Sequence, residues 1–180
     1  NSANIGSDHA ILAIYNTTGP NKGLYTMERD EFLKLAYTYK PTLTSKEFDE
    51  VLQALRSMVP LRQRSNNEDL IPVNNGVFDY RIKQFLPFSP NLVFTAKSHI
   101  NFNPTAENVV LHNDSDNTDW DVESWMKSLS DDPQIVKLLW QTLGAIIRPN
   151  VSWDKSVWLY STKGNNGKGT LCELMRNLCG

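Results

Sequence analysis

Residues 71–88 read IPVNNGVFDYRIKQFLPF, and this stretch predicts the centre of the fold. Two apolar runs flank the Asn-Gly pair at 75–76, which is the strongest short-range signal for a β-hairpin. A second turn over residues 81–84 leads to another apolar run, and a further strand is expected over about residues 92–102. The sequence therefore predicts a small, irregular β-sheet in the middle of the chain.

Strands are also expected near the start of the chain. Residues 9–15 are typical of a strand, residues 16–23 of a turn-rich connection, and residues 24–26 of a returning strand. Residues 1–3 are small and polar, and we interpret them as a remnant of an expression vector.

Helical patterns flank the central sheet on both sides. Apolar residues at helical spacing predict four helices, which cover about residues 28–39, 45–59, 119–129 and 133–147. The second opens with a capping box from Thr44 to Glu47, and the fourth with the pair Asp132-Pro133. Thr118 is the expected cap of the third helix. Together with the sheet, these helices predict an α+β fold that is mainly helical.

The sequence LYSTKGNNGKGTLCELMRNLCG at residues 159–180 predicts a phosphate-binding loop. The apolar run over residues 156–160 is typical of a buried strand, and apolar residues at helical spacing follow the loop. Gly164 and Gly167 permit positive φ angles and close approach of the backbone to phosphate oxygens, and Lys168 supplies a positive charge for them. Strand, glycine loop, lysine and helix in this order are the context of a Walker A loop.

The predicted ATP-binding residues are contiguous. They are Gly164, Asn165, Asn166, Gly167, Lys168, Gly169 and Thr170. The Walker A pattern has glycine where Thr162 stands here, and a hydroxyl residue where Gly169 stands. The alternative interpretation is a turn rich in Gly and Asn that caps an ordinary surface helix. Lys168 and the flanking elements favour the phosphate-binding loop.

Composition and charge restrict the class of protein. The content of 40% hydrophobic and 21% charged residues is that of a soluble globular protein, and the net charge of −2 means that any DNA contact must be local. The sequence has neither an apolar stretch of about 18 residues nor a secretion signal, so we expect a cytoplasmic protein without a membrane partner. Cys172 and Cys179 fit neither a redox pair nor a zinc site and are expected to be free thiols.

The best local basic cluster lies on and just before the predicted hairpins. Its candidate DNA contacts are Arg62, Arg64, Arg81, Lys83 and Lys97. Because Tyr80, Phe85 and Phe88 are interleaved with these cations, the cluster is suited to hold single-stranded DNA by charge and stacking. The alternative is that the aromatic residues belong to the core and their basic neighbours are solvated.

No metal site is predicted. The three histidines, His9, His99 and His112, stand in different segments without the spacing of metal ligands. An acidic run consists of Asp114, Asp116, Asp119 and Asp121, and a solvated loop that leads into a helix N-terminus accounts for it.

Three features occur in a specific order: IPVNNGVFDYRIKQFLPFSPNLVFTAKSHINFNP, the helical pair DVESWMKSLSDDPQIVKLLWQTLGAIIRP, and LYSTKGNNGKGT. This order resembles the D-five N-terminal-like domain that precedes the helicase in phage and plasmid primase-helicases and in the poxvirus primase-helicase. In that family an N-G-V-[FL]-D segment starts a hairpin. A helix pair that ends in a glycine-containing turn of hydrophobic residues follows, and Gly144 falls in the corresponding helix here. A superfamily-three helicase then opens with its Walker A loop.

The resemblance implies an accessory domain over residues 1–152 and the first strand, loop and helix of a P-loop ATPase over residues 153–180. The full-length protein would use ATP and Mg²⁺ and form a hexameric ring on single-stranded DNA. The chain looks like a fragment of that protein. A Walker A loop alone cannot perform phosphoryl transfer, so the fragment is expected to be inactive and to bind no cofactor tightly.

Two other functions stay open. The Lys-Gly-Thr ending of the loop is also similar to the loop of adenylate kinases, which allows a stand-alone small P-loop kinase or NTPase, although such kinases carry the loop near the N-terminus. The second alternative is a non-catalytic replication or interaction protein whose glycine loop is structural.

Overall fold

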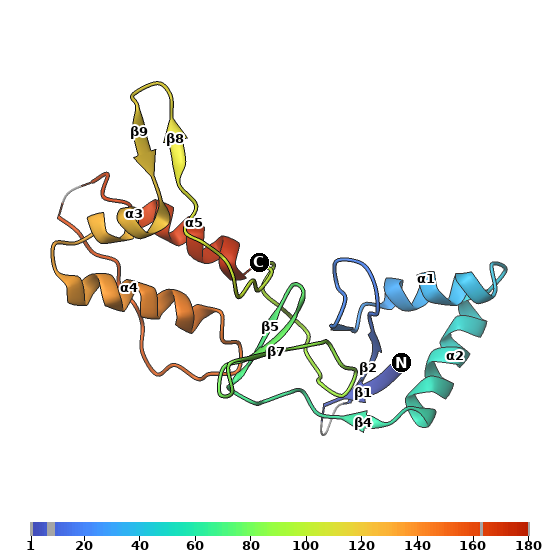
Figure 1. The fold of residues 1–180 in the computed structure, drawn as a ribbon. Coiled ribbons are helices and arrows are strands. Elements are labelled where there is room, and N and C mark those ends of the chain that lie inside the picture. The colour runs from blue at the N-terminus through green and yellow to red at the C-terminus, as the bar shows by residue number, and fades with distance from the viewer. Residues whose placement is uncertain (1, 7–9, 163, 180) are drawn as a thin grey trace.

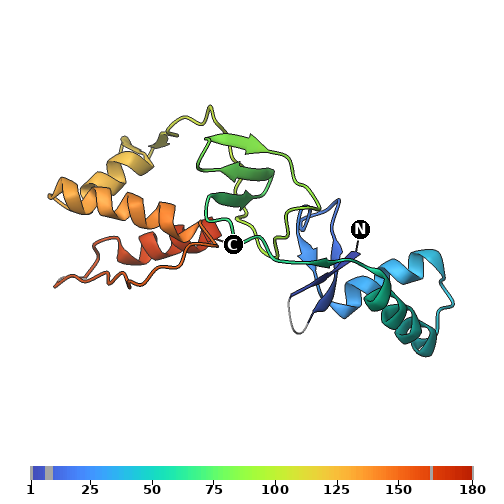
Figure 2. The ribbon, with the colours of Figure 1, turned by 90° about the horizontal axis from the view of Figure 1, so that it is seen from below.

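The computed structural model describes residues 2–6, 10–162 and 164–179 and has an α+β fold (Figure 1). Its helices are α1 (Arg29–Tyr39), α2 (Ser45–Met58), α3 (Val122–Ser128), α4 (Pro133–Ile146) and α5 (Lys168–Cys179). Its strands are β1 (Ser2–Ile5), β2 (Ile11–Tyr15), β3 (Tyr25–Thr26), β4 (Leu61–Arg62), β5 (Leu70–Val73), β6 (Gly76–Asp79), β7 (Gln84–Leu86), β8 (Leu111–Asn113) and β9 (Thr118–Trp120). Figures 1 and 2 show α1 and α2 with the first sheet at one end, β5–β7 in the middle, and α3–α5 at the other end.

The first sheet has the strand order β3-β2-β1-β4, with β1 in its interior. β1 pairs antiparallel with β2 and parallel with β4, and the side chains of Ala3 and Ile5 are buried. Ser2 and Ala3 are therefore part of the fold, which the sequence did not predict for these small residues. The predicted strand at residues 9–15 is β2; His9, like Asn1, lies outside the described residues.

Helices α1 and α2 form where the sequence predicts them, and they pack against the first sheet. Leu12 of β2 forms a buried cluster with Phe32, Phe48 and Leu52 of the helices. The capping box of α2 is confirmed, because the backbone N–H of Thr44 donates to Glu47 Oε2 at 2.8 Å and the N–H of Glu47 donates to Thr44 Oγ1 at 3.4 Å. These local hydrogen bonds explain why the start of α2 can be recognised from four residues.

The predicted hairpin forms the second sheet, β5-β6-β7. Its turn is Asn74-Asn75 and not the predicted Asn-Gly pair, because Val73 pairs with Gly76, which is the first residue of β6. A Cβ atom on Gly76 would lie 2.5 Å from Cζ of Phe85 and 2.6 Å from the carbonyl oxygen of Leu86. Glycine is needed here because β7 approaches closely. The second turn also forms, and Lys83 in it has a φ of 55°.

The strand predicted over residues 92–102 does not form, and that segment is irregular. Its backbone groups bond to several different elements. The N–H of Tyr25 donates to the carbonyl of Phe94 at 2.8 Å, whereas the N–H of Ser98 donates to the carbonyl of Pro72 at 3.0 Å. Since Phe94 is buried, the apolar residues that suggested a strand instead join the first sheet to the second.

A third unit contains α3, α4 and α5 around Met126, Leu143 and Leu171, which are buried in one cluster. Asp132 caps α4 and accepts a hydrogen bond from the N–H of Gln134 at 2.8 Å, with proline at the first turn as predicted. The helix predicted to follow the glycine loop is α5, and it shares its core with α3 and α4. The boundary proposed at residues 152/153 thus separates segments that pack together here, and it stays a prediction.

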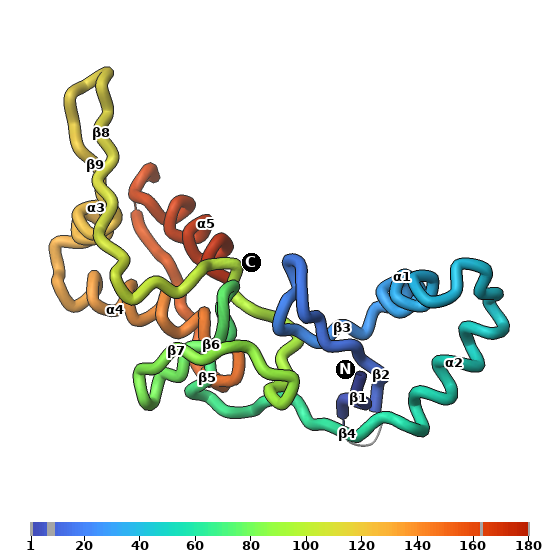
Figure 3. Tube along the Cα trace, turned by 45° about the vertical axis from the view of Figure 1, so that its right-hand side comes forward, coloured from blue at the N-terminus to red at the C-terminus, as the bar shows by residue number. Residues whose placement is uncertain are grey.

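The expected cap of α3 was wrong. Thr118 lies in β9, which pairs with β8 in a hairpin that the sequence did not indicate, and the tube in Figure 3 shows this hairpin projecting from the helical end. The cap is Asp121, whose carboxylate accepts from the N–H of Ser124 at 2.9 Å. Among the described helices, none combines the length and apolar character that a membrane span requires.

Candidate phosphate-binding site

The glycine loop is held against α3. Gly167 has a φ of 79°, and Asn165 has a φ of 54°. A Cβ atom on Gly167 would lie 2.5 Å from Cδ2 of Leu129 and 3.7 Å from Cζ2 of Trp125. The positive φ and the close approach both require glycine at position 167.

Lys168 is the first residue of α5, and its ammonium points back over the loop. Nζ of Lys168 donates to Oδ1 of Asn166 at 2.6 Å, and Nδ2 of Asn166 donates to Oγ of Ser161. The first backbone N–H groups of a helix have no partner within the helix and carry partial positive charge. The loop therefore brings a lysine and a helix N-terminus together, which is the electrostatic arrangement that phosphate requires.

Gly169 and Thr170 follow in the first turn of α5 and are exposed. A Cβ atom on Gly169 would have no neighbour within 4 Å, so the structure leaves room for the hydroxyl residue of the usual Walker A pattern. Nothing in the packing of this turn demands glycine at position 169.

The strand predicted before the loop does not form. Residues 156–160 have no strand partner in the described part of the chain, and Trp158 is 88% exposed. Leu159 packs against the cluster of α3–α5, whereas Val157 and Tyr160 are exposed with Trp158. The prediction of a buried strand was wrong for this structure, because a strand needs a neighbouring strand to satisfy its backbone groups.

A cavity of about 390 Å³ opens beside the loop. Its lining includes Asn166, Gly167 and Lys168 of the loop, residues of α4 and of the segment 157–161, and the side chains of Leu129 and Leu171. The α4 wall includes Leu138, which is half-exposed. The cavity thus joins the cationic loop to an apolar wall, an arrangement that the sequence alone did not indicate.

The candidate DNA contacts differ in their exposure. Arg81 and Lys83 are exposed in the turn between β6 and β7, and Arg64 is exposed after β4. Arg62 donates from Nη1 to Oδ1 of Asn91 at 3.1 Å. Lys97 is only 8% exposed, so it cannot reach a DNA backbone in this conformation.

Lys97 is instead an internal link between the first two sheets. Its ammonium donates to the carbonyls of Lys22 at 3.0 Å and Asn74 at 3.3 Å, and it lies 5.3 Å from the ring centroid of Phe88. Burial lowers the pKa of Lys97, and the charge of Lys22 lowers it further. Phe88 packs in the core cluster below it, which agrees with the alternative of core aromatic residues for this side chain.

Two cations from different elements lie over the ring of Tyr80. Nζ of Lys83 is 3.2 Å and Cζ of Arg148 is 4.8 Å from the centroid of its ring. Arg148 follows α4 and donates to the carbonyl of Glu68, which ties the helical unit to the second sheet. Sequence reasoning missed Arg148, because 68 positions separate it from Tyr80 and no local pattern connects them.

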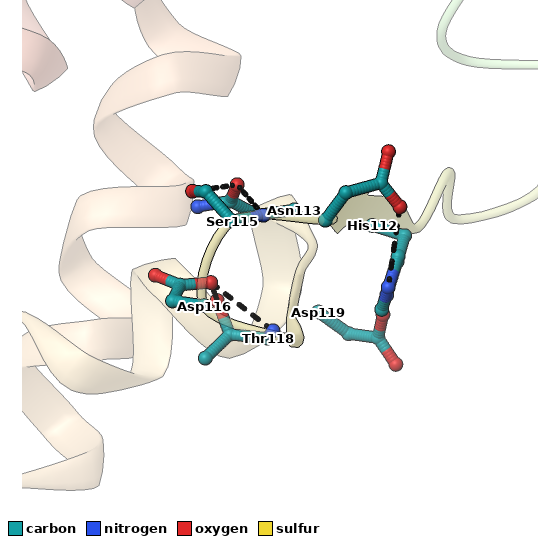
Figure 4. Close-up of polar contacts among 7 residues, drawn as sticks. His112, Asn113, Ser115, Asp116, Thr118 and Asp119 are labelled. Atoms are coloured by element: carbon teal, nitrogen blue, oxygen red, sulfur yellow. Dashed lines mark hydrogen bonds and ion pairs between the residues drawn. The ribbon is translucent and has the colours of Figure 1, made fainter.

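Asp114, Asp116 and Asp119 of the acidic run lie on the β8–β9 hairpin, where Figure 4 shows polar contacts, whereas Asp121 caps α3. Nδ1 of His112 is 2.7 Å from Oδ1 of Asp119, and its Nε2 is 3.6 Å from Oδ1 of Asp114. Asp116 accepts from the N–H and hydroxyl of Thr118. Within residues 2–6, 10–162 and 164–179 no three His, Cys, Asp or Glu side chains form a group that could hold a metal.

The family of the chain follows from a comparison with known families. The sequence profile of the family described as D5 N terminal like matches residues 22–144, from the connection before β3 into α4. The match spans more than half of the chain, so the chain belongs to the D5 N terminal like family. The members of this family are domains that precede the helicase in D5-like primase-helicases. The chain is therefore related to proteins of DNA replication. A comparison with curated proteins finds no match.

Proposed function

We propose that the chain is the accessory domain of a replicative primase-helicase together with the phosphate-binding loop of its ATP-driven motor. The observation that carries the proposal is the placement of Gly167 and Lys168 at the N-terminus of α5, beside a cavity. Family membership supports the helicase over a stand-alone kinase, because the matched residues 22–144 precede the loop, as they do in primase-helicases.

In this proposal the loop at residues 164–170 receives the β- and γ-phosphates of ATP. Lys168 would exchange its bond to Asn166 for a phosphate oxygen, and the N–H groups of the first turn of α5 would donate to the phosphates. Because Gly169 has no hydroxyl, Mg²⁺ would be held through water, which it retains readily, and the Thr170 hydroxyl would turn to a phosphate.

The loop residues supply neither an acidic metal ligand nor a group that positions water, and phosphoryl transfer needs both. The 180-residue chain is therefore expected to bind nucleotide weakly and to hydrolyse none.

Lys168→Ala tests this function, with Lys137→Ala on α4 as the control because Lys137 is exposed outside the cavity. In the full-length protein Lys168→Ala should abolish ATPase activity, and in this chain it should remove weak binding of nucleotide and of inorganic tripolyphosphate. Equal binding by both variants would refute the phosphate-binding loop. Hydrolysis by this chain that Lys168→Ala removes would refute the expected inactivity.

We also propose that the full-length protein acts in the cytoplasm as a hexameric ring on single-stranded DNA, with the β6–β7 turn as a DNA contact. The exposure of Arg81 and Lys83 beside the exposed ring of Tyr80 supports the contact. Arg81→Ala and Lys83→Ala should each weaken single-stranded DNA binding and reduce its salt dependence, as loss of a phosphate contact does. Salt-insensitive binding would contradict the contact, and sedimentation of the full-length protein as a monomer with ATP would contradict the ring.

A further inference from the structure

We propose that the cavity beside Lys168 binds the base of a nucleoside triphosphate, held between Trp158 and the apolar wall of α4. The inference rests on the proposed function, because it places the base relative to phosphates bound on the loop. The inference also states that α4 of the accessory domain, and not only the loop, contacts the nucleotide.

The lining of the cavity combines two kinds of groups. Asn166, Gly167 and Lys168 bring a positive charge and a helix N-terminus to it. Leu138 and its α4 neighbours contribute apolar side chains. A ligand that complements both kinds of groups has an anionic part and a flat, weakly polar part, which describes a nucleoside triphosphate. A volume of about 390 Å³ is within the range of small-ligand sites.

The aromatic side chains at the cavity provide the surface for stacking. Trp158 and Tyr160 line it and are 88% and 84% exposed, so most of their ring area is available. Every base has a π-face, and stacking on an aromatic side chain tolerates different bases. The apolar α4 wall supplies few groups that read the edge of a base. We therefore expect ATP and GTP to bind about equally and purines better than pyrimidines.

The base and the phosphates can be tested separately on this chain. The ¹⁵N-labelled protein is titrated with ATP and with inorganic tripolyphosphate, and amide shifts give both dissociation constants. Trp158→Ala should weaken the binding of ATP about tenfold, which is the scale of one stacking contact, and should leave the binding of tripolyphosphate unchanged. The matched control is Trp153→Ala, since Trp153 is 54% exposed but does not line the cavity.

A second pair tests the α4 wall. Leu138→Gln should weaken the binding of ATP but not that of tripolyphosphate. Leu35→Gln is its control, because both leucines lie on helices and are 51% and 44% exposed. Neither substitution creates a cavity in a buried core, so both variants should fold and amide spectra will verify this.

The outcomes separate this inference from the proposed function. If Lys168→Ala weakens both ligands but Trp158→Ala and Leu138→Gln leave ATP unchanged, the base lies elsewhere and only the loop binds. If Lys168→Ala changes neither ligand, the proposed function fails. Absence of saturable ATP binding at millimolar concentration, or equal losses for ATP and tripolyphosphate in Trp158→Ala, overturns the inference. Amide shifts confined to α4 and residues 157–161 without any at Lys168 would indicate an apolar partner instead of a nucleotide.

Discussion

Gly167→Ala should destabilise the packing of α5 against α3, whereas Gly164→Ala should have almost no effect. Gly167 has a φ of 79°, which costs an L-residue about 1–2 kcal/mol. Its new Cβ would lie 2.5 Å from Cδ2 of Leu129, so that side chain must move. Because Cδ2 is the end of a flexible side chain, we take the lower limit for overpacking, about 1 kcal/mol. The expected loss of unfolding free energy is about 2–3 kcal/mol.

Two other glycines calibrate the measurement, since neither has an atom within 4 Å of an added Cβ. Gly164→Ala should stay within about 0.5 kcal/mol of the wild type, as for most surface changes. Gly144→Ala, inside α4, should stabilise by about 0.5–1 kcal/mol, because glycine is a poor helix former. Urea unfolding monitored by circular dichroism gives the three values, and hydrogen exchange of the α5 amides locates the change.

A double-mutant cycle separates the two costs at Gly167. In the Leu129→Ala background the steric cost disappears and the backbone cost remains, so Gly167→Ala should destabilise by about 1 kcal/mol less than in the wild type. Two results would refute the predicted close packing at Gly167. One is an unfolding free energy of Gly167→Ala equal to that of Gly164→Ala, and the other is an unchanged cost of Gly167→Ala in the Leu129→Ala background.

Two further predictions concern acid stability and the loop. Hydrogen bonds from Lys40 and Thr44 lower the pKa of Glu47 to about 2, and those from the hydroxyl and N–H of Ser124 and from Asn108 lower that of Asp121 to about 2. Because these carboxyl groups titrate near 4 when unfolded, their stabilisation is complete above about pH 4.5 and is lost as the pH falls towards 2. Circular dichroism during acid titration should show this loss of stability. Glu47→Gln and Asp121→Asn should each make stability depend less on pH, and an unchanged pH dependence in these variants would contradict the role of the two carboxyl groups. In the full-length motor, Thr170→Val should weaken nucleotide binding by about 1–3 kcal/mol and Gly169→Ser should be tolerated, as measured by ATPase rate against Mg²⁺ concentration. A silent Thr170→Val combined with an inactive Gly169→Ser would show that the loop does not hold phosphate in this way.

Features that depend on neighbours in the chain were predictable from the sequence. The capping box at Thr44 and the Asp132-Pro133 start of α4 formed where expected, and the predicted hairpin formed with its turn one residue earlier, at 74–75. Each is specified by hydrogen bonds or backbone preferences within a few residues, so its pattern can be recognised without knowing the rest of the fold. The same holds for the start of α5 at Lys168 and for the positive φ of Gly167.

The surroundings of the loop were not predictable in this way. Trp125 and Leu129 contact the position of Gly167, yet their spacing indicates only a helix with one apolar face. The cavity combines α4 with residues 157–161, and which helix faces the loop depends on packing between segments distant in the sequence.

The sequence by itself determined the local elements, the candidate loop and a family resemblance, because these depend on short patterns and their order. Only the tertiary structure decided that β1 is an interior strand, that residues 92–102 join two sheets without forming a strand, and that Lys97 is buried. Pairing and burial depend on partners far along the chain. An apolar run such as 92–102 or 156–160 becomes a strand only where another strand satisfies its backbone N–H and carbonyl groups.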